Sequence, residues 1–466
     1  MVEKTMGYFR RNINFATWSC IHRLPRLFVE WWQLKQLQRT ISDAYCCVPL
    51  YQKLLDEKQV NPSDIKHLSD IVRFPVLNKQ VFLQHPIDET MNSSIPNMYI
   101  RWGQTSGTTG EPFRFPRTSL TLRFHDLRYL YFSRYRFLVW GGSNINSMVE
   151  RMRIAQIGTN IDLRHRLLFI PIDDLRSAPE RVFFKLNEFK PNLLESVTSI
   201  LIELGQIQKK LPPRYRVTIP YMYAYGEALS KEQREYLEEA FDAETYAQYG
   251  TEEVGAVALQ CKKHSFHINE ESYLVEILDE NDKPLPNGTA GRVVITCFFN
   301  NVMPFIRYDV GDHGLIWPEN CSCGIPSRCL SIDGRVGGFL TIGQKKFHHI
   351  EFHIFMSRLG KNILKYQFVN TRSGKLELRV IPTANFSLTE KVTFIEDFQK
   401  EFGFKPDLRI TDRIVPLPDG KTAVIIDETH NYNIITGFHG LARGYLHKYK
   451  GKSAVDSKNL PADKVR

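Results

Sequence analysis

The chain has 466 residues, 42% of them hydrophobic and 24% charged, which is typical of a soluble globular protein of about three domains. The cysteines are few and irregularly spaced, which argues against a secreted disulfide scaffold. We find no apolar run long enough to span a bilayer and no clean signal sequence, so we expect a soluble cytoplasmic protein. The net charge of +10 favours anionic ligands or surfaces, but the absence of a zinc-finger repeat, ribonucleoprotein motif or long basic tract predicts no nucleic-acid partner.

The N-terminal segment has a helical pattern. Apolar residues recur every three or four positions, with basic residues among them, and we expect this face to pack on its own domain. The basic, Trp-containing face also leaves a peripheral membrane contact open. The apolar positions are Leu27, Trp31, Leu34, Leu37, Ile41 and Tyr45. In the next segment, Ser63 or Asp64 is suited to cap a short helix.

From about residue 100 to 330, short apolar runs alternate with helical patterns, which indicates an α/β fold. After residue 270 the pattern shortens to the period of β-strands. The expected strands are 167–172, 218–225, 273–278 and 291–296, and the expected helices are 193–204 and 231–241.

A domain boundary is expected at 333–338, where three glycines in five positions favour a flexible joint. The prediction is a large α/β domain over 1–333, whose first 45 residues form the basic helical segment, and a small mobile α+β lid over 334–440. The remaining residues, 441–466, form a basic and flexible tail.

Three segments carry recognisable chemistry. Thr105–Pro112 combines hydroxyl side chains with two glycines, so its backbone N–H groups can form an anion-binding loop, although it lacks the Walker pattern. Tyr249–Gly255 pairs an aromatic ring with carboxylates that suit a nucleotide base and Mg²⁺. Arg307–Asp312 places an aspartate after a glycine at a strand end, where it can accept bonds from ribose hydroxyls. Each segment alone is equally compatible with an ordinary loop or turn.

Together and in this order, the three segments resemble the adenylate-forming (acyl-CoA synthetase, AMP-binding) superfamily. The similarity is strongest to its phenylacetate-CoA ligase-like branch, which includes coenzyme F390 synthetases and the capsule-biosynthesis CapK proteins. It also covers Pro75–Lys79, the Gly334-Arg335 hinge and Gly420-Lys421, and it runs from about Tyr45 to about Asp427.

The resemblance implies a role for each matched residue. The phosphate loop consists of Thr105, Ser106, Gly107, Thr108, Thr109 and Gly110. The adenine pocket consists of Tyr249, Gly226 and Glu227, and Gly250 and Thr251 are further nucleotide-binding residues. The catalytic and ribose-binding residues are Glu253 (Mg²⁺), Asp312 (ribose), Arg335 (hinge) and Lys421, a cation that offsets charge in the adenylation transition state.

The function implied is ATP-dependent formation of an acyl-adenylate, with release of pyrophosphate, and then acyl transfer. CoA, a carrier thiol or an amino sugar could accept the acyl group, and the CapK-like members suggest capsular or exopolysaccharide biosynthesis. Three positions depart from the family pattern: Glu111, Glu252 and the pair Gly337–Gly338. They leave open a catalytically reduced nucleotide-binding accessory protein of a glycan assembly system.

A structural zinc site is predicted at Cys261, His267, Cys321 and Cys323. Three thiolates and one imidazole suit tetrahedral Zn²⁺, and the surrounding residues also resemble the same branch, some members of which carry such a site. His264 and Cys329 are further candidate ligands. Four unrelated buried side chains are the alternative, because cytosolic cysteines are often simply packed in a core.

Overall fold

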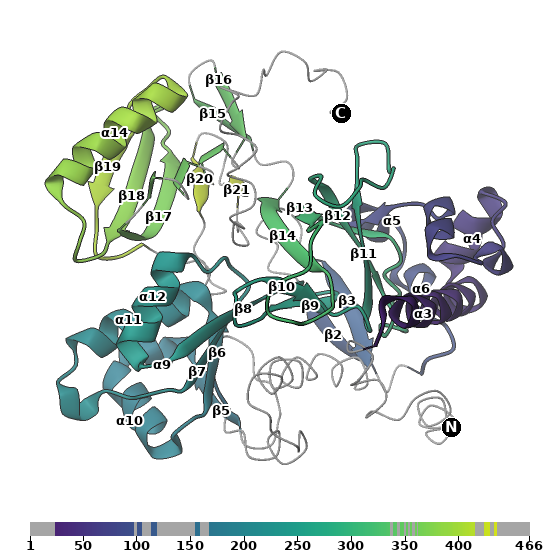
Figure 1. Cartoon of the computed structure of the whole chain (residues 1–466), viewed down its shortest axis with the longest axis horizontal. Coiled ribbons are helices and arrows are strands. Elements are labelled where there is room, and N and C mark those ends of the chain that lie inside the picture. Colours follow the sequence, from purple (N-terminus) through teal and green to yellow (C-terminus); the bar gives the residue numbers. More distant parts are fainter. Residues whose placement is uncertain are drawn as a thin grey trace.

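The computed structural model describes residues 24–96, 100–104, 113–118, 154–158, 167–335, 339–342, 345–348, 351–352, 355–356, 359–360, 362–414, 424–428 and 433–435. The predicted phosphate loop Thr105–Gly110, Glu111, Gly337, Gly338, Lys421 and the tail 441–466 lie outside these residues. Figure 1 shows a broad central sheet with helices beside each half and a separate C-terminal unit.

A twelve-stranded sheet runs through the described part of the chain. Its order is β11-β12-β13-β14-β10-β9-β8-β7-β6-β4-β5, with the short β1 paired to β13. β8 joins a parallel half, formed with β7, β6, β4 and β5, to an antiparallel half. The strands are β1 (Leu77–Asn78), β4 (Ile154–Gly158), β5 (Leu167–Pro171), β6 (Leu193–Val197), β7 (Tyr221–Tyr225), β8 (Glu244–Thr251), β9 (Gly255–Gln260), β10 (Phe266–Ile268), β11 (Tyr273–Leu278), β12 (Gly291–Cys297), β13 (Tyr308–Ile316) and β14 (Cys329–Arg335). A separate antiparallel pair is β2 (Ile100–Gln104) with β3 (Arg114–Thr118).

Helices accompany the parallel half of the sheet, as expected for an α/β arrangement (Figure 1). They are α9 (Ile172–Ser177), α10 (Pro179–Phe189), α11 (Thr198–Lys210), α12 (Lys231–Phe241) and the 3-10 turn Pro213–Tyr215. The helix predicted over 193–204 was wrong in its first five residues, which form β6. All five are buried, and a strand covered on both faces has a continuous buried run without the alternation that marks exposed strands. The helix predicted over 231–241 is confirmed, and its Ser230–Gln233 capping box fixes where it begins.

The N-terminal region is helical. It comprises α3 (Arg26–Cys47), α4 (Pro49–Glu57), 3-10 helices at Pro62–Asp64 and Leu68–Arg73, α5 (Lys79–Gln84) and α6 (Ile87–Thr90). Part of the apolar face predicted for α3 was wrong, because Leu27 is 81% exposed and Trp31 is 51% exposed. The buried side of this helix follows a four-residue step instead, through Val29, Gln33, Leu37 and Ile41.

The cap predicted for the short turn after α4 was also displaced. Asn61, rather than Ser63 or Asp64, caps the 3-10 helix by accepting a hydrogen bond from the backbone N–H of Ser63 at 2.9 Å. Asp64 instead bonds back to the Asn61 N–H at 3.0 Å.

The C-terminal unit has a sheet of its own, in the order β19-β18-β17-β20-β21, with α14 packed on it. Its elements are β17 (Ile363–Asn370), β18 (Leu376–Pro382), α14 (Leu388–Phe402), β19 (Asp407–Ile410), β20 (Ile425–Asp427) and β21 (Asn433–Ile435). The hairpin β15 (Phe339–Ile342) and β16 (Lys345–His348) precedes it. Phenylalanines from β17 and α14, including Phe368, Phe398 and Phe402, form its core.

In the described residues, no helix combines the length and the hydropathy needed to cross a bilayer.

Candidate functional site

Two of the motifs identified in the sequence meet through paired tyrosines and carboxylates. The Tyr249 hydroxyl donates to Asp312 Oδ2 at 2.8 Å, and the Tyr308 hydroxyl donates to Glu253 Oε1 at 2.9 Å. Three strands separate β8 from β13 in the sheet order, so these contacts require a strongly curved sheet. The result is two buried carboxylates, each oriented by a tyrosine of the other motif.

Asp312 and Tyr249 differ in setting from what the sequence suggested. Asp312 lies inside strand β13 rather than at its end, directly opposite Arg335 of β14. The Tyr249 side chain is fully buried. A contact between this ring and a nucleotide base therefore requires neighbouring side chains to move when the nucleotide binds.

Backbone geometry explains two glycines of the site. A Cβ on Gly250 would lie 2.0 Å from the carbonyl oxygen of Gly255, because the β8–β9 hairpin closes tightly there. Gly226 has φ +74°, a conformation that glycine adopts without strain. This turn presents Glu227, which is buried and accepts a 2.7 Å hydrogen bond from the Ser199 N–H and another from the Ser199 hydroxyl. The 3.3 Å bond from Val254 N to Thr251 Oγ1 orders the loop after β8.

The two crowded carboxylates at Glu252 and Glu253 have separate partners. The Arg117 guanidinium donates to the Glu252 backbone carbonyl at 2.9 Å and lies 3.5 Å from its carboxylate. Glu252 is largely exposed, whereas Glu253 is buried against Tyr308. The glutamate at position 252, which departs from the family pattern, therefore does not share the partner of Glu253.

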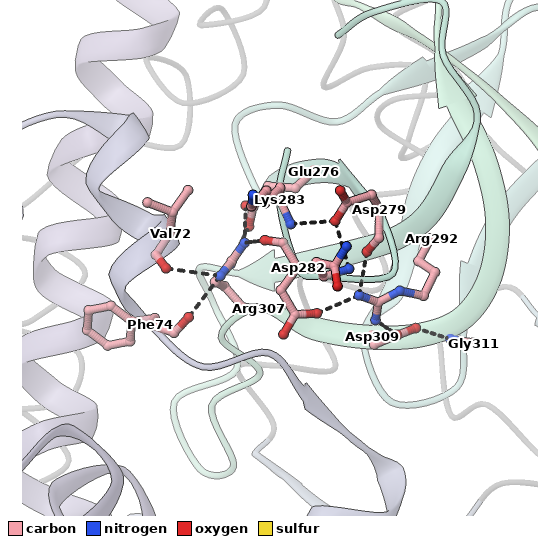
Figure 2. Close-up of polar contacts among 11 residues, drawn as sticks. Val72, Phe74, Glu276, Asp279, Asp282, Lys283, Arg292, Arg307, Asp309 and Gly311 are labelled. Atoms are coloured by element: carbon pink, nitrogen blue, oxygen red, sulfur yellow. Dashed lines mark hydrogen bonds and ion pairs between the residues drawn. The ribbon is translucent and has the colours of Figure 1, made fainter. Parts of the chain in front are cut away.

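A buried arginine anchors the motif that ends in Asp312 (Figure 2). Arg307 is 1% exposed and has φ +47°. Its guanidinium binds the Glu276 carboxylate at 3.0 Å and the Phe74 carbonyl oxygen at 2.8 Å. Its own carbonyl accepts from Leu77 N at 3.0 Å, so the N-terminal Pro75–Lys79 motif is fastened to β13. Sequence reasoning singled out this motif but missed the arginine's anchoring role.

The residues of the predicted metal site come together. The ligand atoms of Cys261, His267, Cys321 and Cys323 all lie within 4.8 Å of one another. The Cys261 and Cys321 sulfurs are 3.8 Å apart, and two thiolates at about 2.3 Å from one tetrahedral Zn²⁺ would be about 3.8 Å apart. The donor set and spacing fit zinc.

Neighbouring groups orient these ligands as metal sites usually require. His267 Nδ1 lies 3.0 Å from the Ser327 carbonyl, while Nε2 lies 3.2 Å from the Cys323 sulfur. The N–H groups of Lys263 and Ile325 donate to the Cys261 and Cys323 sulfurs at 3.3 and 3.4 Å. A hydrogen bond from Cys323 is the main cause that lowers the pKa of Cys261 below its ordinary value, and the thiolate is the form that binds a metal. Of the further candidates, the Cys329 sulfur lies 3.6 Å from His267 Nε2, and the His264 ring lies 5.9 Å from the Tyr246 ring in a tilted arrangement.

Helix α3 packs on this cluster. Val29 and Trp32 share a buried cluster with Cys261, Cys321 and Cys329. The Glu270 carboxylate, close in sequence to His267, binds Arg26 of α3 and Arg328, each at 2.6 Å. Trp32 Nε1 donates to the Glu271 carbonyl at 3.0 Å. The Cys/His cluster and the N-terminal helix therefore form one structural unit.

Comparisons with known proteins agree with this fold. The chain is 24% identical over 397 residues to phenylacetate-coenzyme A ligase of Thermus thermophilus, covering 82% of this chain and 85% of the relative. The crystal structure of 2-hydroxyisobutyryl-CoA ligase in the postadenylation state, in complex with 2-HIB-AMP, aligns with a TM-score of 0.68 and 21% identity over 87% of this chain and 90% of that one. The same enzyme in its thioesterification state, with CoA, aligns with a TM-score of 0.56 and 22% identity over the same shares of the chains. No protein-family model matches the chain.

The fold is thus that of adenylate-forming ligases, and the α/β prediction is confirmed. The sequence is similar to phenylacetate-coenzyme A ligases over most of its length.

Proposed function

We propose that the chain activates a carboxylic acid with ATP and transfers the acyl group to CoA. The observation that carries the proposal is the pair of bonds Tyr249–Asp312 and Glu253–Tyr308, which gathers two buried carboxylates of separate nucleotide-type motifs in one site. Similarity to phenylacetate-coenzyme A ligases supports a CoA acceptor. A ligase crystallised with 2-HIB-AMP shares the fold, which supports an acyl-adenylate intermediate.

The chemistry has two displacement steps. A carboxylate oxygen attacks the α-phosphorus of ATP, a P–O bond forms and pyrophosphate leaves. The thiolate of CoA then attacks the acyl carbonyl, a C–S bond forms and AMP leaves. Because the first step joins two anions, it needs cations near the phosphates.

The chain's own residues divide these tasks. A carboxylate has several acceptor positions, and we assign the Asp312 carboxylate, which Tyr249 orients, to the ribose hydroxyls. Glu253, oriented by Tyr308, would hold Mg²⁺, and the ion would supply positive charge against the phosphates. The 105–110 loop binds the phosphates. Tyr249, Gly226 and Glu227 form the adenine side, and Gly250 and Thr251 contribute to the nucleotide site. Arg335 acts from the junction between the domains and Lys421 from the lid.

We assign residues 1–333 to the large domain and 334–440 to a mobile lid. The separate sheet and separate phenylalanine core of the C-terminal unit support this division. We also assign Zn²⁺ to Cys261, His267, Cys321 and Cys323 as a structural metal.

ATP–pyrophosphate exchange tests the proposal. Purified protein is incubated with aryl acids such as phenylacetate and hydroxy acids such as 2-hydroxyisobutyrate, and we expect exchange with at least one acid. The variant Asp312→Asn should raise the KM for ATP about tenfold or more, because a charged hydrogen-bond acceptor is lost. The control Asp412→Asn changes an exposed aspartate of the C-terminal unit and should behave as wild type.

The acceptor is tested with the best acid, by offering CoA, a carrier thiol or an amino sugar to the acyl-adenylate. CoA should be the preferred acceptor. Preference for an amino sugar would instead support the role in polysaccharide biosynthesis. Nucleotide binding without exchange across the whole acid panel would overturn catalysis in favour of an accessory protein.

A further inference from the structure

A lysine of the C-terminal unit is buried against the large domain. Lys365, the third residue of β17, is 9% exposed. Its Nζ donates to the backbone carbonyl of Ser199 at 2.9 Å, at the beginning of α11. Figure 1 shows β17 above the α11–α12 pair, and 166 positions of sequence separate the two bonded residues.

A neighbouring contact fixes the position of this strand. The Gln233 side chain of α12 donates to the Leu364 carbonyl at 2.9 Å. Leu364 itself is buried in the main core of the large domain. Lys365 therefore follows a residue that is fixed to the large domain both by a hydrogen bond from Gln233 and by burial of its own side chain.

The target of Lys365 also binds Glu227. Ser199 uses its carbonyl for Lys365, while its N–H and hydroxyl both donate to the Glu227 carboxylate. Thr198 adds a bond from its hydroxyl to the Glu227 carbonyl at 3.2 Å. One residue thus connects the C-terminal unit to a side chain that the proposed function assigns to the nucleotide pocket.

Burial of the Lys365 ammonium group costs free energy, which argues that its contact with Ser199 is not incidental. Burial is the main cause that lowers the pKa of Lys365, while the negative charges of Glu227 and Glu203 oppose that effect and the positive charge of Arg176 adds to it. Burying an ammonium group costs free energy unless acidic partners and hydrogen bonds compensate it. An apolar side chain would fill this interface at lower cost.

We propose that Lys365 is a positioning residue which, while the C-terminal unit is docked in this orientation, holds Ser199 and Glu227 in place for the adenylation step. The expected effect on adenylation rests on the proposed function. The contact between Lys365 and Ser199 does not, because it is observed in the structure.

The test compares Lys365→Met with Lys365→Arg, which keeps a cation, and with Lys375→Met, the same change at an exposed lysine of the same unit. Two half-reactions are measured separately: pyrophosphate exchange, and CoA thioester formation from a preformed acyl-adenylate. Hydrogen exchange of the amides in 198–202 and 363–366 is measured in all variants, together with thermal unfolding.

Lys365→Met should slow pyrophosphate exchange about tenfold, as expected for loss of a charged hydrogen bond, and change thioester formation less than twofold. Lys365→Arg should recover part of the exchange rate, and amides in both segments should exchange faster in Lys365→Met alone. Equal losses in both half-reactions, or hydrogen exchange identical to wild type, would overturn the inference. If wild-type protein gives no pyrophosphate exchange with any acid, the proposed function fails, and hydrogen exchange still decides whether Lys365 couples the two units.

Discussion

Arg307 illustrates how a single residue can secure a site without reaching a ligand. Its guanidinium binds the Glu276 carboxylate and two backbone carbonyls of the N-terminal segment (Figure 2). Its own backbone is hydrogen-bonded to Leu77 and Thr296. Arg307 directly precedes strand β13, and Asp312 follows five residues later within that strand. The position of the Asp312 carboxylate therefore depends on this anchor.

Replacing Arg307 with Met should destabilise the protein by about 3–5 kcal/mol, because Glu276 is left as a buried charge without its partner. Burial already raises the pKa of Glu276, and Arg307 opposes that rise. Without the arginine, the pKa of Glu276 in the folded protein rises further. At a pH below that pKa, Glu276 is protonated in the folded protein and no longer costs the energy of a buried charge. The destabilisation should therefore be smaller at pH 5 than at pH 8.

Urea unfolding at both pH values measures this effect. Arg214→Met, at an exposed arginine, serves as the control and should shift stability by less than about 0.5 kcal/mol at either pH. A loss of stability for Arg307→Met that does not vary with pH would contradict the role assigned to Glu276.

Sequence reasoning at this scale singled out Glu227, Glu253 and Asp312 as candidates but did not predict which residues contact them. Tyr308 and Ser199 were within or near recognised segments, yet nothing in their local spacing shows that they face carboxylates 55 and 28 positions away. Lys365 lies within a mostly buried strand, and no sequence pattern around it predicts a contact with the large domain. Such contacts follow from chain topology, which short-range patterns do not contain.

Among the elements, α3 depends on a buried carboxylate. Burial alone would raise the pKa of Glu270, but Arg328 and Arg26 hold it below its ordinary value of 4.5. A lowered carboxyl pKa contributes stability that is present above 4.5 and is lost as the pH falls through the folded-state pKa. We therefore expect acid to weaken the docking of α3.

Glu270→Gln should reduce stability by about 3 kcal/mol at pH 7, and the difference from wild type should shrink as the pH falls below 4.5. Guanidinium unfolding between pH 7 and pH 3.5 measures it. Glu280→Gln, at an exposed glutamate, should match wild type throughout. A constant difference across that range would show that the Glu270 charge does not hold the helix.

The proposed zinc ion joins β10 to the loop between β13 and β14. Because metal binding supplies folding free energy, Cys321→Ser should lower the melting temperature by several degrees and reduce the bound metal from about one ion per chain to well below one. Elemental analysis and thermal unfolding measure both quantities. Cys46→Ser, at an exposed cysteine, should change neither. Metal-free wild-type protein of unchanged stability would refute the site.

Sequence patterns predicted these elements unevenly. The helix 231–241 and the strand 273–278 were found with their bounds, because amphipathic periods and capping residues are local signals. The β6–α11 junction was missed because a fully buried strand and a buried helix share the same apolar composition. The exposed start of α3 was missed because periodicity alone does not show where the covering surface ends.

For the whole molecule, alternating patterns predicted the α/β class but not the single curved sheet that joins a parallel to an antiparallel half at β8. That curvature brings β8 and β13 together, and it follows from long-range strand order. The metal-site residues were predicted as a set because cysteine and histidine are rare enough for their spacing to carry information. No comparable sequence pattern predicted the contact between Lys365 of the C-terminal unit and Ser199 of the large domain.

The last prediction concerns Lys421, which lies outside the described residues. Strand β20 begins four positions later and pairs with β17, the strand that carries Lys365, and we therefore assign Lys421 to the same C-terminal unit. If it supplies the cation for adenylation, Lys421→Ala should slow pyrophosphate exchange about a hundredfold or more. ATP binding should change little, because Tyr249 and Asp312 belong to the large domain, and thioester formation from a preformed acyl-adenylate should survive.

Lys405→Ala, at an exposed lysine of the same unit, is the matched control and should retain wild-type rates. We assign Lys421 and Lys365 different contributions to one step: Lys421 acts on the phosphates, whereas Lys365 holds Ser199 and Glu227 in place. Lys421→Ala should therefore leave hydrogen exchange at 198–202 unchanged, whereas Lys365→Met raises it. A Lys421→Ala protein that adenylates normally, or that also loses ATP binding, would show that the transition-state cation lies elsewhere in the chain.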